Sequence, residues 1–166
     1  MALDKYELPL SIVGHGDASR LRRELLEIDS FIKQAALRQP GTPLKRLPKE
    51  SMGLSDFLDT NKLNLLKEED RAAAIAFVNE LVDKAPVVHI SFAADPSSVF
   101  ISKITDWFRQ NIDRLVLVNI GLEPSIAVGC TLRTDNHFHD FSLRKRFDSQ
   151  RQLLLSKLKE SRPASQ

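Results

Sequence analysis

The chain has 166 residues, 42% of them apolar and 28% charged, a composition typical of a folded globular protein rather than a disordered one. No apolar run approaches the roughly 18 residues that a membrane-spanning helix needs, and residues 1–5 lack the apolar core of a secretory leader. The formal net charge of +2 is too small to predict nucleic-acid binding, and the single cysteine excludes an internal disulfide and points to the cytosol.

Residues 1–85 are predicted to be mainly helical. A short extended stretch at 7–13 contains Pro9, which is typical of an edge strand or a docking arm. The helix that follows is predicted to be capped by Asp17 or Ser19. Its apolar side chains form one stripe at helical spacing: Leu21, Leu25, Ile28 and Ile32.

Residues 39–49 contain three prolines and a basic cluster, and this composition predicts a linker. A short helix and a turn are predicted between 52 and 66. A clear helix over 67–84 has acidic residues in its first turn, where they favour the helix dipole, and it ends at Ala85-Pro86. Its predicted apolar stripe is Ala73, Ala76, Phe77 and Leu81.

Residues 86–162 are predicted to form a small domain with a β-sheet, and 163–166 a tail. A strand rich in β-branched residues covers 87–93. Asp95-Pro96 predicts a helix start with proline at the first helical position. A nearly continuous apolar strand over 114–122 is predicted to be central and covered on both faces. The helix between these strands is predicted to bury Ile101, Ile104, Phe108 and Ile112.

The stretch from 122 to 158 predicts a strand, a tight turn, a second strand and a last helix. The turn is placed at Asp135-Asn136, and the Ser142 hydroxyl is predicted to cap the helix. Apolar residues of the first strand recur at period two: Leu122, Ile126, Val128, Cys130 and Leu132. The stripe of the last helix is Leu143, Phe147, Leu154 and Leu158. The predicted fold class is therefore α+β, an N-terminal helical region followed by a small mixed β-sheet domain of order β-α-β-β-β-α.

This C-terminal half resembles the C-terminal domain of the ATP synthase delta subunit, the bacterial counterpart of the mitochondrial oligomycin-sensitivity-conferring protein. The resemblance covers roughly residues 86 to 160, about half of the chain. The residues that match in register, without a gap, are Glu123-Pro124-Ser125-Ile126, Gly129, Arg133, Asp140 and Ser142-Leu143-Arg144. The chain departs from the family pattern at three glycine positions, which hold Val128, Asp135 and Phe141.

The resemblance implies a non-catalytic stator subunit of a proton- or sodium-translocating rotary ATP synthase. In that family the C-terminal domain receives the b-type helices of the peripheral stalk, and an N-terminal bundle of about six helices caps the alpha subunits of the catalytic head. It implies no cofactor, no metal and no membrane span of its own, and a cytoplasmic place beside the inner (plasma) membrane. The positions carried over as determinants of domain shape are Pro124, Gly129, Asp140, Ser142 and Arg144. The candidate partner-facing residues are Trp107, Phe147, Leu154 and Leu158.

Two other binding functions remain open. The E-type stator subunit of vacuolar and archaeal ATPases also combines helices with a small α+β C-terminal domain. A small RNA-binding or ribosome-associated protein is the alternative from a different class. Residues 142–166 carry seven Lys and Arg against two acids, a local net charge of 7 − 2 = +5. Basic residues 144–146 lie beside Phe141 and Phe147, an arrangement also found in RNA-binding modules.

Enzymatic and metal-binding interpretations rest on the hairpin. Cys130, His137 and His139 are predicted to share one of its faces and could bind zinc or form a Cys-His pair. Asp140, Ser142 and Arg144 could act as acid, nucleophile and positioning cation. The favoured interpretation is structural, with two solvated histidines, a half-buried thiol, and a carboxylate and hydroxyl that satisfy backbone amides.

A glycine-rich turn near the N-terminus also suggests phosphate binding. Gly14-His15-Gly16 lies between an extended segment and a helix, as phosphate-cradling turns do. Ser19 occupies the place of the third glycine, and no Lys-Ser/Thr pair follows. The favoured interpretation is a turn followed by a helix cap.

Overall fold

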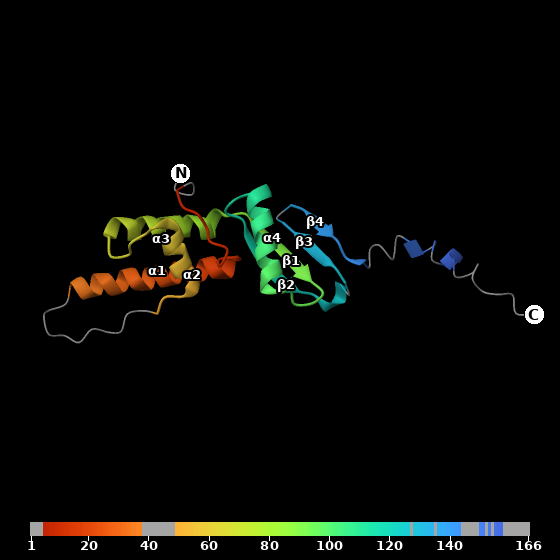
Figure 1. Ribbon diagram of the computed structural model, residues 1–166, viewed down its shortest axis with the longest axis horizontal. Helices are drawn as coiled ribbons and strands as arrows, with labels where there is room; N and C mark the ends of the chain where they lie inside the picture. The colour runs from red at the N-terminus through yellow and green to blue at the C-terminus, as the bar shows by residue number, and fades with distance from the viewer. Residues whose placement is uncertain are drawn as a thin grey trace, which may run out of the picture. The chain divides into compact units, whose positions relative to one another are not determined.

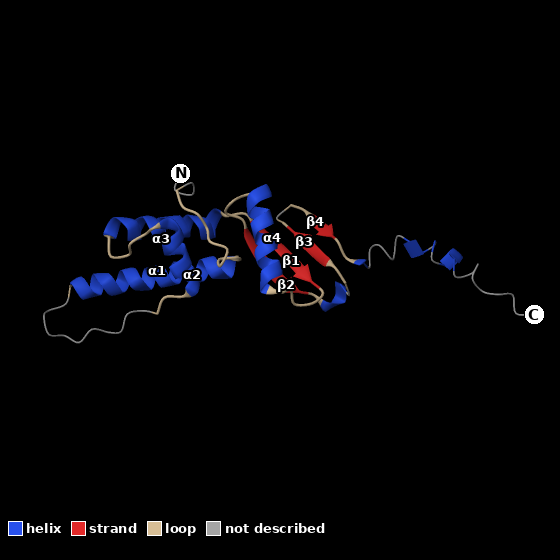
Figure 2. Ribbon diagram, viewed as in Figure 1, coloured by secondary structure: helices blue, strands red, loops and turns tan. Residues whose placement is uncertain are grey.

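The computed structural model describes residues 5–37, 49–126, 128–134, 136–143, 150, 151, 153 and 155–157. Its elements, in chain order, are α1 (His15–Ala36), α2 (Met52–Asn61), α3 (Glu68–Lys84), β1 (Val87–Phe92), α4 (Ser98–Asn111), β2 (Leu117–Leu122), the 3-10 turn η2 (Pro124–Ile126), β3 (Cys130–Arg133) and β4 (Phe138–Asp140) (Figure 1). Helices come first and a four-stranded sheet follows (Figure 2), so the predicted α+β class is confirmed.

The described residues form two compact units. The first contains those up to Val87 together with Ser97–Asn119, and the second contains Val88–Pro96 together with those from Ile120 onward. Helix α4 therefore belongs to the same unit as α1, α2 and α3. Within the described residues, no helix is both long enough and apolar enough to cross a membrane.

The first unit is built around one apolar cluster to which α1, α2 and α3 contribute. Helix α1 packs against both α2 and α3. Three aromatic rings meet inside the cluster: Tyr6 and Phe77 lie edge to face at 5.3 Å, and Phe57 stacks on Phe77 at 5.8 Å. The predicted stripe of α1 is confirmed: Leu21, Leu25 and Ile28 are buried, and Ile32 packs against the cluster. The largest fully buried apolar side chains of the cluster are Ile12, Leu25, Leu54, Phe57, Phe77, Leu81 and Leu117.

The buried faces of α3 and α4 differ from the predicted stripes. In α3 the buried apolar side chains are those of residues 74, 77, 78 and 81. The helix turns the bulkier Val78 toward the cluster, and Ala76 is therefore exposed. In α4 Thr105 and Phe108 are buried, whereas Ile112 follows the last helical residue and is 59% exposed. The start of α4 is also corrected. Ser97 is its N-cap, its hydroxyl accepting a hydrogen bond from the Phe100 amide at 3.3 Å, so proline precedes the helix.

An ion pair with little exposure joins α1 to α3. The Arg71 Nε atom lies 2.7 Å from Asp29 Oδ1, and the side chains are only 5% and 16% exposed. Arg71 also donates to the carbonyl of Leu65 at 2.8 Å, and Lys33 Nζ lies 2.8 Å from the other Asp29 oxygen. Hydrogen bonds from Lys33 and Arg71 lower the pKa of Asp29 below its ordinary 3.8. The pair therefore fixes how these two helices align.

The extended stretch at 7–13 docks as an arm, one of its two predicted roles. The Arg109 guanidinium of α4 donates hydrogen bonds to the carbonyl oxygens of Leu8, Pro9 and Ile12. Burial of Arg109 lowers its pKa to about 10, which still leaves the guanidinium protonated at neutral pH. One side chain thus binds three carbonyl oxygens of the arm, of which the Pro9 oxygen also accepts from the Ile12 amide at 3.1 Å.

The sheet has the strand order β2-β1-β3-β4. Strand β3 runs antiparallel to both β1 and β4. The Leu117 amide donates to the Pro86 carbonyl and the Glu123 amide to the Phe92 carbonyl, with the same offset in each case (117 − 86 = 123 − 92 = 31). A constant offset means that β1 and β2 run parallel, so the sheet is mixed, as predicted.

Two predictions about the sheet are wrong. Strand β2 lies at an edge rather than in the centre. Its start is nevertheless covered on both faces, as predicted: Leu117 belongs to the cluster of the first unit, and Val118, on the opposite face, is 1% exposed. The period-two pattern from 122 to 132 is not one strand. Pro124 has no backbone N–H for a sheet ladder and starts η2, so β3 begins only at Cys130. Alternating apolar residues here lie on a strand end, a turn and a second strand.

The predicted hairpin register is confirmed, since Leu132 lies opposite His139 and Thr131 opposite Asp140. Asp135 of the predicted turn lies outside the described residues, as do most of the linker predicted at 39–49 and the tail at 163–166. Of the predicted last helix, the described residues 143, 150, 151, 153 and 155–157 are helical.

Candidate functional site

Three positions carried over from the resemblance meet where the β3–β4 hairpin ends: Gly129, Asp140 and Ser142. Two backbone hydrogen bonds bring the segments together, from the Phe141 amide to the Cys130 carbonyl and from the Leu143 amide to the Val128 carbonyl, each at 3.0 Å. The chain entering β3 and the chain leaving β4 are therefore paired beyond the strand ends.

Gly129 permits this close pairing. Its φ is +106°, in the range that favours glycine. A Cβ atom at this position would lie 2.6 Å from the Phe141 carbonyl oxygen and 2.9 Å from the Ser142 Cα atom. No side chain fits without moving backbone, so a glycine is required here on steric grounds alone.

Asp140 and Ser142 turn the chain out of the sheet. The Asp140 Oδ1 atom accepts a hydrogen bond from the Ser142 amide at 2.8 Å, and Ser142 is only 6% exposed. A buried hydroxyl behind a carboxylate that binds backbone is poorly placed to attack a substrate. The geometry favours a structural role for both residues over the acid and nucleophile interpretation.

The remaining predicted positions are only partly described. Pro124 begins η2 and is exposed, and Arg144 lies outside the described residues. Among the candidate partner-facing residues, Phe147, Leu154 and Leu158 also lie outside them. Trp107 is described: it is 56% exposed on α4, with its ring edge-on to Phe108 at 5.3 Å.

The hairpin histidines form a short aromatic row. The rings of His137 and His139 lie 6.1 Å apart, and those of His139 and Phe141 6.0 Å apart. The register places Cys130 on the same face, as expected. Burial raises the pKa of the Cys130 thiol, which disfavours the reactive thiolate. No group of three His, Cys, Asp or Glu side chains among the described residues could hold a metal ion, so the zinc interpretation finds no support there.

The Gly14-His15-Gly16 turn is occupied by the protein itself. Asp17 accepts hydrogen bonds from the amides of Val13 and Gly14, at 3.2 Å each, instead of serving as the N-cap. The Asn119 side chain accepts one from the His15 amide at 3.0 Å. The amides of Val13, Gly14 and His15 are thus bonded to these two side chains, which supports the interpretation as a turn and cap.

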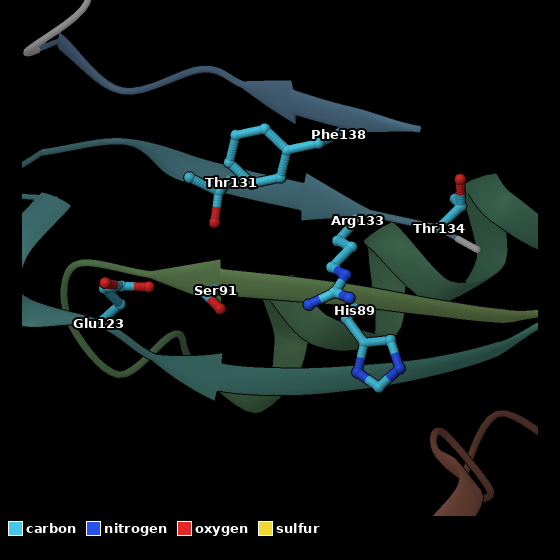
Figure 3. A pocket seen from close by; sticks show the side chains of 7 residues that line it. All are labelled: His89, Ser91, Glu123, Thr131, Arg133, Thr134 and Phe138. Atoms are coloured by element: carbon cyan, nitrogen blue, oxygen red, sulfur yellow. The ribbon is translucent and has the colours of Figure 1, made fainter. Parts of the chain in front are cut away.

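The sheet also carries a polar cavity that sequence reasoning missed (Figure 3). Its volume is about 610 Å³. His89 and Ser91 of β1 and Thr131 and Arg133 of β3 line it (Figure 3). Val88 and Ile90, on the opposite face of β1, are buried. The alternating polar residues of β1 were the available signal. The lining residues are His89, Ser91, Glu123, Thr131, Arg133, Thr134 and Phe138, and we call this site the sheet cavity.

The two ends of the sheet cavity differ in charge. Arg133 lies opposite His89 in the strand register, and its side chain extends toward His89 in Figure 3. In the described part of the chain, no acidic side chain lies within salt-bridge distance of Arg133. Glu123 lies at the other end and accepts a hydrogen bond from the Ser125 hydroxyl at 2.8 Å. The cavity is thus basic at one end and acidic at the other.

Comparison of the sequence with models of known protein families gives no match, and comparison with curated proteins gives none.

Proposed function

We propose that this protein is a non-catalytic stator subunit of a rotary ATP synthase, similar in its C-terminal half to the delta subunit. The observation that carries the proposal is the junction at Gly129, Asp140 and Ser142. Gly129 matches the family pattern and stands where a Cβ atom would clash with backbone, and Asp140, which also matches, accepts a hydrogen bond from the Ser142 amide.

The proposal assigns b-type stalk helices and the alpha subunits of the head as partners, on the cytoplasmic side of the membrane. A stator transmits torque through stiff contacts and needs no reaction centre. Two observations support it: the buried Ser142 hydroxyl and the raised pKa of Cys130 both disfavour a nucleophile in the hairpin. The helical part, with α1, α2 and α3, would form the contact with the head in place of a six-helix bundle.

The test is an affinity purification of the tagged protein from its own gently solubilised membranes, with the co-purifying chains identified. We expect stalk and head subunits in fixed ratio. The Gly129→Ala variant perturbs the C-terminal unit and should lose the stalk, whereas the matched control Gly16→Ala should keep it. Recovery of RNA or ribosomal proteins, with no ATP synthase subunit, would refute the proposal and favour the basic C-terminal segment as the binding element.

A further inference from the structure

The polar groups of the sheet cavity are not used by the fold. Among the described residues, neither the Arg133 guanidinium nor the hydroxyls of Ser91 and Thr131 take part in a side-chain hydrogen bond. With about 610 Å³, the cavity also falls within the range of roughly 300 to 1,000 Å³ that small-molecule sites occupy. Donors without a structural partner, gathered in a cavity of this size, indicate a ligand-binding site.

Gly121 keeps the cavity open beside Ser91. A Cβ atom at this position of β2 would lie 3.2 Å from the Ser91 hydroxyl, which itself lines the cavity. A side chain at residue 121 would therefore crowd that hydroxyl. Glycine leaves it accessible to a ligand.

The end of the cavity that Arg133 and His89 form suits a phosphate group. A guanidinium binds phosphate through two parallel hydrogen bonds. The His89 ring, opposite Arg133 in the strand register, provides a further donor, and so does the hydroxyl of Thr131. A phosphate monoester offers three free oxygens, so it makes use of more donors than a carboxylate does.

The rest of the cavity suits a chain or ring that carries hydroxyl groups. The Ser91 and Thr131 hydroxyls both donate and accept, as the hydroxyl groups of a sugar do. The Glu123 carboxylate at the far end only accepts, and one of its oxygens is engaged by the Ser125 hydroxyl. Phe138 is 64% exposed and lines the same cavity, where its ring offers an apolar surface to the C–H groups of a sugar.

The separation of the two ends agrees with a ligand of this size. Arg133 lies opposite His89, and the Glu123 amide bonds to the carbonyl of the residue three positions further along β1. Strands β3 and β2 flank β1, so the two backbone positions are about 10 Å apart along the strands and about 9.6 Å apart across them, or about 14 Å in all.

The side chains shorten this distance. Arg133 extends toward His89 in Figure 3, which removes about one spacing between strands and leaves about 11 Å. Hydrogen bonds of about 2.8 Å at each end leave roughly 5 Å for the ligand itself. A phosphorylated sugar spans this length, whereas the adjacent charges of an α-amino acid are too close together to reach both ends.

We propose that the sheet cavity binds a sugar phosphate, with the phosphate at Arg133 and His89 and the sugar hydroxyl groups at Ser91 and Glu123. All residues of the site belong to the second compact unit. The proposal goes beyond the stator function and does not depend on it, because the site needs no partner chain.

The test is a titration of the full-length chain, labelled with ¹⁵N, with glucose 6-phosphate and ribose 5-phosphate. Glucose and inorganic phosphate are the matched control ligands, since each carries only one of the two recognised parts. We expect at least one sugar phosphate to shift the amide signals of β1 and β3, with an affinity about 10-fold above that of either control. Absence of these shifts with both sugar phosphates, or equal affinity for inorganic phosphate, would overturn the proposal.

Two variants separate the ends of the site. Arg133→Gln should lower the affinity for inorganic phosphate and for the sugar phosphate alike, by about 10-fold. Glu123→Ala should lower only the affinity for the sugar phosphate, by about 5-fold. Arg23→Gln, at an exposed position on α1, is the matched control and should change neither. Equal effects of Arg133→Gln and Arg23→Gln, or a loss of phosphate affinity in Glu123→Ala, would contradict the assignment of the two ends.

Discussion

Replacement of Gly129 by alanine is expected to destabilise the C-terminal unit. The added Cβ would lie 2.6 Å from one backbone oxygen and 2.9 Å from a Cα atom, and the φ of +106° is itself costly for alanine. Strain of this kind costs about 1 to 3 kcal/mol, and relief of the clash needs backbone movement in addition. We therefore expect a loss of about 3 kcal/mol in the free energy of unfolding.

The assay is thermal unfolding followed by circular dichroism, with amide spectra to locate the change. A loss of this size corresponds to a decrease in Tm of roughly 6 to 12 °C for a chain of this length. Gly16→Ala is the matched control: a Cβ there would meet no atom within 4 Å, and the position lies in α1. It should raise the free energy of unfolding by up to about 1 kcal/mol. Equal effects of the two variants would refute the steric account of the junction.

Three further predictions concern single side chains. Asp29→Asn should lower the free energy of unfolding at neutral pH by about 2 kcal/mol. Because folding lowers the pKa of Asp29, the stabilisation by its carboxylate is lost as the pH falls below 3.8. The urea midpoints of the variant and the wild type should therefore converge in acid. Cys130 should react with iodoacetamide more slowly than a free cysteine peptide at mildly alkaline pH, and equally fast in urea, since burial raises its pKa. Arg109→Leu removes the donors of three arm carbonyls and should cost about 2 to 4 kcal/mol, with faster proteolysis at residues 7–13 and partial recovery in Arg109→Lys.

The parts of the fold that depend on neighbouring residues could be predicted from the sequence. The stripe of α1 follows from helical spacing, because Leu21, Leu25 and Ile28 recur on one face whatever packs against them. The hairpin register follows from the turn position, since a two-residue turn at Asp135-Asn136 pairs Leu132 with His139. The α+β class follows from the order of these local patterns.

The parts that depend on distant residues could not. At the start of α1 the His15 amide donates to the side chain of Asn119, which lies 104 residues further along the chain. No rule based on neighbouring residues could predict this partner, and such rules point to Asp17 instead. The edge position of β2 was hidden because the strand begins with residues buried on both faces, Leu117 in the cluster of the first unit and Val118 opposite, which is the pattern of a central strand.

The sheet cavity was decided by tertiary structure for the same reason. The sequence by itself determined that β1 alternates polar and apolar residues, and that β3 does so too. Only the antiparallel pairing of these strands, across about forty residues of intervening chain, brings Arg133 opposite His89 and Thr131 opposite Ser91. Local periodicity determines which face a side chain is on, whereas strand pairing decides which side chains share that face.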